Sequence, residues 1–416
     1  MLRHILMSLN QTVSAERVHI SFFGRRNAGK SSLVNAVTGQ NLAVVSDVKG
    51  TTTDPVKKSM ELLPIGPVVI IDTPGFDDEG TLGELRVQKT REILAKTDVA
   101  VLVLDATEEM GTQEEEFLGL LKEKNLPFIV VKNKVDLVEE IEEKLAASAN
   151  GANQNAYPEL YVSATKNINI KELKDLIGSL AKTKENNKKI VADLVEPGDV
   201  VILVTPIDES APKGRLILPQ QQTIRDIIDA GCMAFVCQDT ELPQTLASLA
   251  KPPKMVITDS QAFGRVSKMV PENIPLTSFS ILFARYKGDL ATQVKGAAML
   301  SKLQDGDKIL IAEGCTHHRQ CGDIGTVKLP NWIQKFSNAK VQIDFTSGGE
   351  FPQDVSEYKL IVHCGGCMLN EAEMKHRISL AKEADVPMTN YGVAIAHVNG
   401  ILKRSLELFP EVLNLL

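Results

Sequence analysis

The sequence has few cysteines and few aromatic residues for its length. Its 416 residues include 6 cysteines, and aromatic residues make up 5%. So few cysteines exclude a disulfide-stabilised scaffold, and thiols that stand near histidines therefore indicate metal binding or catalysis. Apolar residues make up 43% and charged residues 24%, a composition typical of globular domains and not of disordered or fibrous chains.

A long apolar run is also missing. The sequence contains no stretch of about 18 apolar residues, the length at which a helix becomes a candidate for crossing a membrane. The segment MLRHILMSLNQTVSAERVHI at the N-terminus has neither the apolar core of a signal peptide nor a small-residue cleavage site. These features predict a cytoplasmic protein that does not bind membranes.

Basic residues are not in excess. The 46 lysines and arginines are outnumbered by 53 aspartates and glutamates, which gives a formal net charge of -7. A polyanion gains no overall attraction from such a chain, so nucleic acid is not expected as a partner.

The order of apolar runs predicts an α/β chain of three domains. A length of 416 residues exceeds the roughly 100 to 200 residues of an ordinary domain. Short apolar runs alternate with helix-like stretches, which is typical of parallel sheets covered by helices. The segment AKTKENNKK at 181–189 is polar without apolar periodicity and is interpreted as a linker. We therefore expect domains over residues 1–182, 190–283 and 288–416.

Eleven runs are predicted to be strands. They lie at Val18–Phe23, Val68–Ile71, Val99–Leu104, Phe128–Val131 and Leu160–Val162 in the first domain; at Val200–Val204, Met233–Cys237 and Met255–Ile257 in the second; and at Lys308–Ala312, Val341–Phe345 and Tyr358–Val362 in the third.

A glycine-rich segment follows the first predicted strand and runs into a helix-like stretch. Residues 24–31, GRRNAGKS, match the pattern G-x-x-x-x-G-K-[ST] of a phosphate-binding loop. Its glycines let backbone N–H groups close around phosphate oxygens, and the start of the helix adds positive potential. Lys30 is predicted to reach the terminal phosphates and Ser31 to bind Mg²⁺. The other predicted nucleotide-binding residues of this segment are Gly24, Asn27, Ala28, Gly29 and Ser32.

Two segments downstream are suited to sensing the γ-phosphate. Residues 50–54, GTTTD, form a polar stretch in which Thr52 can place its hydroxyl on the metal. Asp72-Thr73-Pro74-Gly75 ends the apolar run VVIID, so that Asp72 can hold Mg²⁺ through water and the Gly75 N–H can meet the γ-phosphate. Lys30, Thr52 and Gly75 are therefore the predicted catalytic residues, and Ser31 and Thr52 the predicted magnesium ligands.

A fourth segment is suited to recognising guanine. Asn133-Lys134-Val135-Asp136 follows the strand FIVVKN, and Ser163-Ala164-Thr165 follows a later strand. A carboxylate at Asp136 that accepts two hydrogen bonds from guanine leaves adenine with mismatched buried groups, which are strongly rejected. Although N-K-x-D alone recurs by chance in surface turns, four segments in this order predict a P-loop GTPase. Its ligands are GTP and Mg²⁺, with Asn133, Lys134, Asp136, Ser163 and Ala164 around the base.

This region resembles the translation-factor-like GTPases, within them the group typified by Era and MnmE. The resemblance is carried by Asn27 in the phosphate-binding loop and by the GTTTD segment. It implies that a K⁺ ion is recruited to the nucleotide through Asn27. Phe76 stands where a glutamine would orient the attacking water directly after D-x-x-G, so intrinsic hydrolysis is predicted to be slow.

Cysteines and histidines gather in two segments of the third domain. Residues 315–318, CTHH, follow the predicted strand KILIAEG, and residues 363–367, HCGGC, follow the run YKLIV. Parallel strands would bring these ends together, so that three thiolates and two or three imidazoles converge. The C-x-x-C spacing lets two sulfurs share a metal, and Gly365 and Gly366 allow the backbone to wrap closely. This chemistry alone supports a Cys₃His zinc site and an iron–sulfur cluster equally.

The combination of these features resembles the HydF family, the [FeFe]-hydrogenase maturation GTPases, over essentially the whole chain. The resemblance rests on the N-terminal GTPase motifs followed by C-x-H and H-C-x-x-C. It implies a GTP-binding domain, an α/β dimerisation domain that forms a homodimer, and an α/β iron–sulfur domain. Its implied metal ligands are Cys315, Cys364 and Cys367 on a [4Fe–4S] cluster. The fourth iron is left open to His317, His363 or a nearby carboxylate such as Asp323, and an exchangeable position is favoured there.

The resemblance also implies a scaffold role. The protein would accept a di-iron precursor from radical-SAM maturases, hold it on or beside the cluster, and deliver it to the [FeFe]-hydrogenase apoprotein. Cys321 is taken as a bystander, Cys232 and Cys237 as small core residues, and His4, His19, His376 and His397 as structural.

The alternative is an RNA-linked assembly GTPase of the Era kind with a structural zinc site. Such a protein is expected to carry a G-x-x-G loop in a basic setting, which the C-terminal part of this sequence lacks. An enzymatic C-terminal site is a third interpretation, but the sequence indicates no general base for it.

Replacing the predicted base reader tests the guanine site. Asp136→Asn exchanges the carboxylate for a group that offers a donor where guanine also has one, so base preference should shift from guanine toward xanthine. Binding of GTP and of XTP to both proteins measures the shift. An unchanged GTP affinity would show that Asp136 does not read the base.

Overall fold

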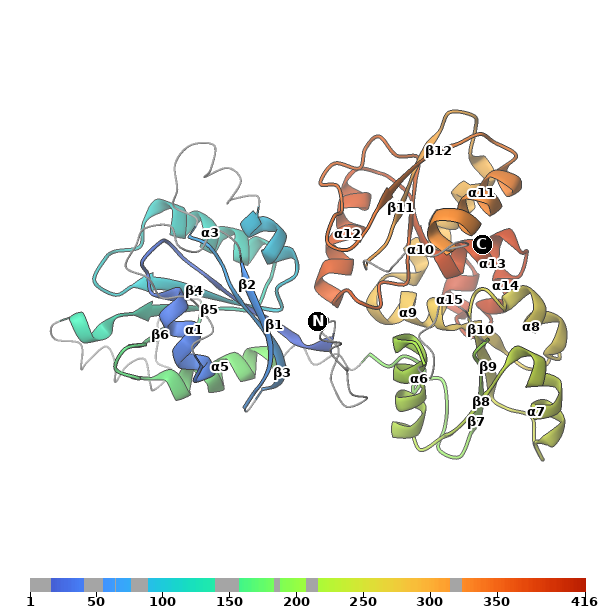
Figure 1. Cartoon of the computed structure of the whole chain (residues 1–416), viewed down its shortest axis with the longest axis horizontal. Coiled ribbons are helices and arrows are strands. Elements are labelled where there is room, and N and C mark those ends of the chain that lie inside the picture. Colours follow the sequence, from blue (N-terminus) through green and yellow to red (C-terminus); the bar gives the residue numbers. More distant parts are fainter. Residues whose placement is uncertain are drawn as a thin grey trace, which may run out of the picture. The chain divides into compact units, whose positions relative to one another are not determined.

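The computed structural model describes residues 16–40, 55–63, 65–75, 89–138, 157–182, 188–206, 216–314 and 324–416. The chain divides into two compact units, Met1–Glu185 and Asn186–Leu416, which are drawn in Figure 1.

The first unit is built on a six-stranded sheet with the order β2-β3-β1-β4-β5-β6. Strands β3, β1, β4, β5 and β6 run parallel, and β2 pairs antiparallel with β3. The parallel strands are nearly continuous apolar runs, as expected of strands that are covered on both faces. The strands are β1 (Val18–Phe23), β2 (Val56–Leu62), β3 (Gly66–Asp72), β4 (Val99–Asp105), β5 (Phe128–Asn133) and β6 (Glu159–Tyr161).

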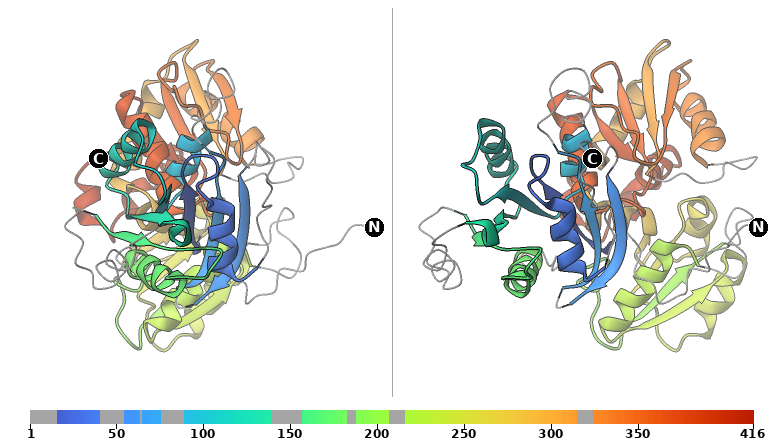
Figure 2. Two further views of the ribbon diagram at one scale, coloured as in Figure 1. Left: turned by 90° about the vertical axis from the view of Figure 1, so that its left-hand side faces the viewer. Right: turned by 60° about the vertical axis from the view of Figure 1, so that its left-hand side comes forward.

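Helices cover both faces of this sheet. Figure 2 shows the blue α1 (Lys30–Thr38) and the green α5 (Ile170–Lys182) together, and their apolar residues share one core with one face of the sheet. Helix α3 (Thr112–Glu123) packs on the opposite face with a second core that includes Phe117. A short 3₁₀ turn, η2 (Val135–Leu137), follows β5.

The second unit contains two four-stranded parallel sheets. Their strand orders are β10-β9-β7-β8 and β12-β11-β13-β14. The elements of the first are β7 (Val200–Val204), α6 (Leu218–Asp229), β8 (Met233–Cys237), η3 (Asp239–Glu241), α7 (Leu242–Ser248), β9 (Met255–Thr258), α8 (Phe263–Met269), β10 (Leu276–Ser278) and α9 (Phe279–Lys287). Those that follow are α10 (Leu290–Ala297), η4 (Ala298–Lys302), β11 (Lys308–Ala312), η5 (Ile324–Lys328), α11 (Leu329–Ser337), β12 (Gln342–Thr346), β13 (Leu360–His363), α12 (Glu371–Glu383), β14 (Met388–Asn390), α13 (Tyr391–Val398), α14 (Leu402–Ser405) and α15 (Pro410–Leu413).

The last helices return to the first of these two sheets. Val393 of α13, Leu402 of α14 and Val412 of α15 belong to the same apolar core as Val201 and Ile257 of the β7–β10 sheet. The two sheets of this unit therefore share packing, and the division at residues 283–288 stays a prediction.

Each predicted strand run overlaps a strand. The ends differ by one or two residues at β3, β4, β5, β6, β9, β12 and β13. Strands β2, β10 and β14 were not predicted, because VKKSMEL is largely polar and LTS and MTN are very short. Helix α5 extends to Lys182, so the predicted linker begins slightly later than 181. Among the described residues, every helix falls short of the length and apolar character that a membrane crossing needs.

Candidate functional site

The phosphate-binding loop connects β1 to α1, as predicted. Two of its glycines have no room for a side chain. Gly24 has φ +150°, and a Cβ there would collide with the carbonyl of Val103 on β4. Gly29 has φ +87°, and a Cβ there would collide with the side-chain amide of Asn133. Both glycines let the loop lie directly against the neighbouring strand ends.

Lys30 lies folded along this loop. Its ammonium is buried and donates to the carbonyl oxygens of Gly24 at 2.9 Å and Arg25 at 2.7 Å. The same loop carries Ala28 and the left-handed Asn27, a conformation that asparagine tolerates better than most residues. Ser32 lies on α1. The predicted phosphate-binding residues are thus brought together.

The predicted magnesium residues Ser31 and Asp72 meet at the carboxyl end of β3. The Ser31 hydroxyl donates to Asp72 Oδ2 at 2.6 Å. Burial raises the pKa of Asp72, while the hydrogen bond from Ser31 and the charge of Lys30 oppose this rise. Asp72 Oδ1 is buried with no hydrogen-bond partner among the described residues. An orphaned carboxylate oxygen beside a hydroxyl suits a hard cation with oxygen ligands, such as Mg²⁺.

Asn133 joins the base-recognition segments to the phosphate-binding loop. Its side-chain amide donates to the Ala28 carbonyl at 3.1 Å, and its Oδ1 accepts from the Ala164 N–H at 3.1 Å. Ser163 donates to Asp136 Oδ1 at 2.5 Å, and this bond, opposed by slight burial, lowers the pKa of Asp136. The carboxylate is therefore charged and oriented, as a guanine reader requires. Gly75 ends the described segment 65–75, and Thr52 lies outside the described residues.

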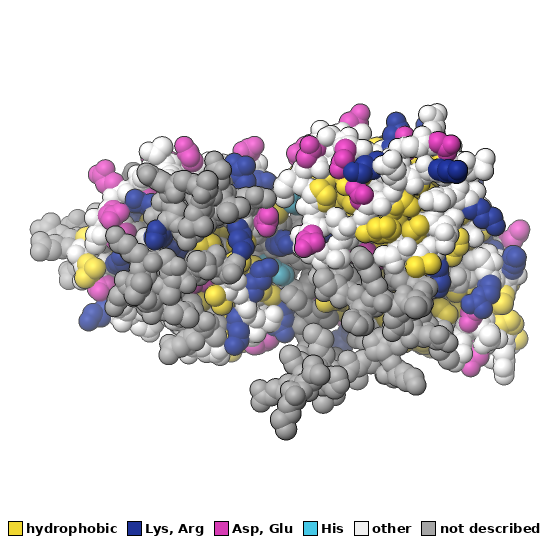
Figure 3. All heavy atoms as spheres, turned by 45° about the horizontal axis from the view of Figure 1, so that its top comes forward, with side chains coloured by type: hydrophobic (Ala, Val, Ile, Leu, Met, Phe, Trp, Pro, Cys, Tyr) yellow, Lys and Arg dark blue, Asp and Glu magenta, His cyan; other side chains and the backbone are white. Residues whose placement is uncertain are grey.

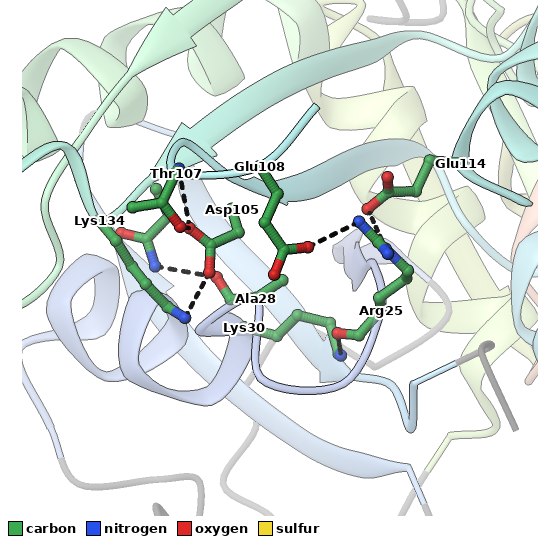
Figure 4. Close-up of polar contacts among 9 residues, drawn as sticks. Arg25, Ala28, Lys30, Asp105, Thr107, Glu108, Glu114 and Lys134 are labelled. Atoms are coloured by element: carbon green, nitrogen blue, oxygen red, sulfur yellow. Dashed lines mark hydrogen bonds and ion pairs between the residues drawn. The ribbon is translucent and has the colours of Figure 1, made fainter. Parts of the chain in front are cut away.

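A network of ion pairs also surrounds this loop, and no sequence motif predicts it (Figure 4). Arg25 Nε lies 2.9 Å from Glu114 Oε1, and Arg25 Nη2 lies 3.0 Å from Glu108 Oε2. The buried Glu114 also accepts from the Gly111 N–H at 2.7 Å. Arg25 therefore ties the loop to the start of α3.

Lys134 is held in a similar way. Its ammonium lies 2.6 Å from Asp105 Oδ2 at the end of β4, and Asp105 also accepts two hydrogen bonds from Thr107. Partial burial of Asp105 acts to raise its pKa, but the hydrogen bonds from Lys134 and Thr107 lower it overall. Sequence motifs predict neither Arg25 nor Asp105. The loop motif allows any residue at position 25, and Asp105 lies outside the motifs.

The two cysteine segments start at neighbouring strand ends. Strands β11 and β13 pair in parallel with Ala312 opposite His363, and the Cys364 N–H donates to the Ala312 carbonyl at 2.8 Å. The predicted meeting of these strand ends is confirmed. The residues 315–323, which include Cys315, His317, Cys321 and Asp323, lie outside the described residues.

The sulfur of Cys364 is surrounded by backbone N–H donors. Its sulfur accepts from the Gly314 N–H at 3.0 Å and from the Gly366 N–H at 3.4 Å. Gly366 has φ +63°, and a Cβ there would lie 2.7 Å from Met374 Sδ. Gly314 directly precedes the predicted ligand Cys315 in the sequence and is the last described residue of its segment. Sulfurs that accept backbone N–H groups suit the thiolate ligands of an iron–sulfur cluster.

Cys367 lies near both Cys364 and Lys287. Burial raises the pKa of Cys367, the nearby Cys364 raises it further, and the charge of Lys287 opposes both. A bound metal reverses such a preference because it deprotonates a coordinating thiol. Among the described residues, no three His, Cys, Asp or Glu side chains come close enough to hold a metal.

His363 is fully buried and uses both ring nitrogens. Its Nε2 lies 3.0 Å from Arg377 Nη1, and its Nδ1 lies 2.8 Å from the Cys364 carbonyl. Because a guanidinium only donates, Nε2 accepts and Nδ1 carries the proton. Arg377 is held in turn by Glu373 at 2.6 Å and by the Gly348 carbonyl at 2.8 Å. His363 as an iron ligand stays a prediction, and it would require Nε2 to leave Arg377.

Cys232, Cys237, His19 and His397 have contacts that fit the structural roles predicted for them. Cys232 and Cys237 are buried in the core of the β7–β10 sheet. His19 Nδ1 lies 2.9 Å from the Arg17 carbonyl, and His397 Nε2 lies 3.2 Å from the Ser301 hydroxyl.

Removing Arg25 tests the support of the phosphate-binding loop. Arg25→Met leaves the buried Glu114 carboxylate without its cation, and nucleotide affinity should fall about tenfold, equal to about 1.4 kcal/mol. Titration with a fluorescent GTP analogue measures this. The control is Arg225→Met, which breaks an exposed ion pair with Asp229 and should leave the affinity unchanged. Equal affinity in Arg25→Met and the wild type would refute the supporting role.

The chain matches models of protein families and is similar to individual known proteins. Family models match residues 19–134 as a 50S ribosome-binding GTPase, residues 190–288 as the Hydrogen maturase F dimerization domain, and residues 291–408 as the Hydrogen maturase F tetramerization domain. The tRNA modification GTPase MnmE of Clostridioides difficile is 35% identical over 174 residues, which cover 41% of this chain and 36% of that protein. GTPase Era of Heliobacterium modesticaldum is 31% identical over 223 residues, which cover 48% of this chain and 74% of that protein.

The chain spans only about a third of the length of the MnmE proteins that head these matches. A solved structure of a probable GTP-binding protein, engB, is 25% identical and covers 40% of this chain and 100% of its own, with a TM-score of 0.32. The two Hydrogen maturase F models together match more than half of the chain, and the GTPase model matches the unit that contains the phosphate-binding loop. The chain therefore belongs to the hydrogen maturase F (HydF) family and carries a GTPase domain in its first unit.

Proposed function

We propose that the chain is a GTP-hydrolysing scaffold of [FeFe]-hydrogenase maturation that holds an iron–sulfur cluster in its second unit. The observation that carries the proposal is the pairing of Ala312 with His363, because it starts both cysteine segments at one sheet edge in a chain of this family. In this role the protein receives a di-iron precursor from radical-SAM maturases and delivers it to the hydrogenase apoprotein.

The first unit supplies the nucleotide chemistry. Ser31 and Asp72 are proposed to hold Mg²⁺, which when bound supplies positive charge to the phosphates. Lys30 exchanges the Gly24 and Arg25 carbonyls for phosphate oxygens, and Asp136 reads guanine. The roles of Thr52, of Gly75 and of a K⁺ ion at Asn27 belong to the same proposal. So does slow intrinsic hydrolysis caused by Phe76.

The second unit is proposed to hold a [4Fe–4S] cluster on Cys315, Cys364 and Cys367, which leaves the fourth iron to His317, His363 or an exchangeable group. The N–H donors around Cys364 support a thiolate there. The zinc alternative uses the same sulfurs. It belongs to an RNA-linked GTPase of the Era kind, for which the support is a similarity that covers 48% of this chain. A cytoplasmic location stays a prediction.

The second unit is also proposed to form the dimer, through the edge of its first sheet. Strand β8 is one of the two edge strands of this sheet, and its Met233, Phe235 and Val236 are exposed, as is Ile228 on α6. An exposed apolar edge is a template for pairing with a second copy. The edge lies in the region matched by the dimerization model.

Apolar side chains are also exposed in the region matched by the tetramerization model, including Phe336, Phe345 and Met368. Figure 3 shows apolar surface among charged side chains.

Charging the β8 edge tests the dimer. Val236→Lys places a charge on the pairing strand, and the mass of the full-length protein by light scattering should fall to half the wild-type value. The control is Met269→Lys on α8, an exposed apolar residue away from this edge, which should leave the mass unchanged. A monomeric wild type, or an unchanged mass for Val236→Lys, would rule out this interface.

Replacing cysteines tests the cluster. Cys364→Ala and Cys367→Ala should each lose most bound iron and the visible absorption of anaerobically prepared protein, because iron–sulfur clusters depend on thiolates. GTP hydrolysis should survive, since the nucleotide residues belong to the other unit. The control Cys232→Ala removes a core thiol and should keep iron. Lys30→Ala should show the reverse pattern, with iron bound and hydrolysis lost. A wild-type protein that is colourless and loaded with zinc would contradict the proposal.

A further inference from the structure

A buried lysine lies directly behind the cysteine loop. Lys287 is the last residue of α9, and only 4% of its surface is exposed. Its ammonium donates to the carbonyl oxygens of Cys367 and Leu369, each at 3.1 Å. These contacts join residues 80 and 82 positions apart in the sequence. Lys287 lies in the region matched by the dimerization model, whereas the loop lies in the region of the tetramerization model.

Lys287 ends a helix whose side chains are mostly buried. Phe279, Ile281, Leu282 and Phe283 of the same helix are buried, and the Lys287 ammonium lies 6.0 Å from the centre of the Phe283 ring. Burying a cation carries a large desolvation cost unless polar groups compensate for it. The end of α9 offers such compensation through its helix dipole, and the two loop carbonyls add direct hydrogen bonds.

The contacted carbonyls belong to a single turn. The Leu369 N–H donates to the Gly366 carbonyl at 3.0 Å, and the next residue, Asn370, caps α12 by accepting from the Glu373 N–H at 3.0 Å. Lys287 thus holds the segment that connects Cys367 to α12. Its position also sets a positive charge next to Cys367, because the carbonyl that accepts its hydrogen bond is that of Cys367 itself.

We propose that Lys287 is a positioning residue of the cluster site, which fixes the turn after Cys367 and places a buried positive charge beside the cluster. The inference rests on the proposed function in that Cys367 binds the cluster. A fixed positive charge stabilises the reduced, more negative state of a cluster, so Lys287 raises its reduction potential. The dimerization region thereby takes part in the chemistry of the C-terminal site.

Two variants separate the charge from the hydrogen bonds. Lys287→Met removes both, whereas Lys287→Gln removes the charge and keeps an N–H donor for the loop carbonyls. The midpoint potential of the full-length, cluster-loaded protein is measured by EPR during titration with dithionite. Both variants should lower the equilibrium constant for reduction on the order of tenfold, or about 59 mV for one electron. Lys287→Met should also unfold at a lower temperature and lose iron faster to a chelator than Lys287→Gln.

The matched control is Lys382→Met. Lys382 is 54% exposed and pairs at 2.9 Å with Asp289, which lies two residues after Lys287. This variant removes a positive charge near the same junction but away from the cysteine loop, so the potential and iron retention should match those of the wild type.

The outcomes distinguish this inference from the proposed function. If the cluster-loaded wild type and Lys287→Gln have the same midpoint potential, the role of the charge is overturned. If Lys287→Met retains iron as well as the wild type does, the positioning role is overturned. Should Lys287→Met fail to fold, Lys287→Gln still decides the potential. A wild type that binds no iron–sulfur cluster at all overturns the proposed function together with the inference.

Discussion

Parallel strand pairing is the constraint on which both candidate sites depend. In a parallel sheet, neighbouring strands end at the same edge, so the loops that leave them start side by side. Phe22 pairs with Asp72, and Asp105 pairs with Asn133, which brings the phosphate-binding, magnesium and base-recognition segments to one edge of the first sheet. Ala312 and His363 do the same for the two cysteine segments. Strand pairing alone thus brings together residues that are far apart in the sequence, whichever ligand the site binds.

Much of the fold and of both sites was predictable because it follows local rules. Apolar runs mark buried strands, and glycine-rich loops at strand ends mark ligand-binding edges. The strands missed were those whose sequence carries no such mark. Strand β2 is a largely exposed, polar edge strand, and β10 and β14 are three residues long. Their pairing is decided by the sheet they join, which a local pattern does not contain.

The supporting residues of the sites were not predictable for a different reason. Arg25 reaches Glu108, which lies 83 residues away in sequence, and Lys287 reaches the Cys367 carbonyl 80 residues away. Neither position has a residue type that a motif demands. His363 shows the converse. Its type and its place beside C-x-x-C predict a ligand, and this stays a prediction. The spacing gives no sign of the Arg377 guanidinium, which lies against His363 Nε2 in the structure.

The same device recurs at both sites. Glu373 and Arg377 form a buried ion pair, and the buried Glu114 pairs with the partly exposed Arg25. Each pair stands behind a predicted ligand-binding loop, and Lys287 is a buried cation in an equivalent place. Buried ion pairs contribute little net stability, because desolvation offsets most of the attraction between the charges. Their hydrogen bonds are directional, however, so a loop held by them has one favoured geometry. A loop that must present several N–H groups or sulfurs to one ligand gains more from a fixed shape than from added stability, because misplacing any one donor weakens the others. This explains why charged side chains are buried next to the two sites.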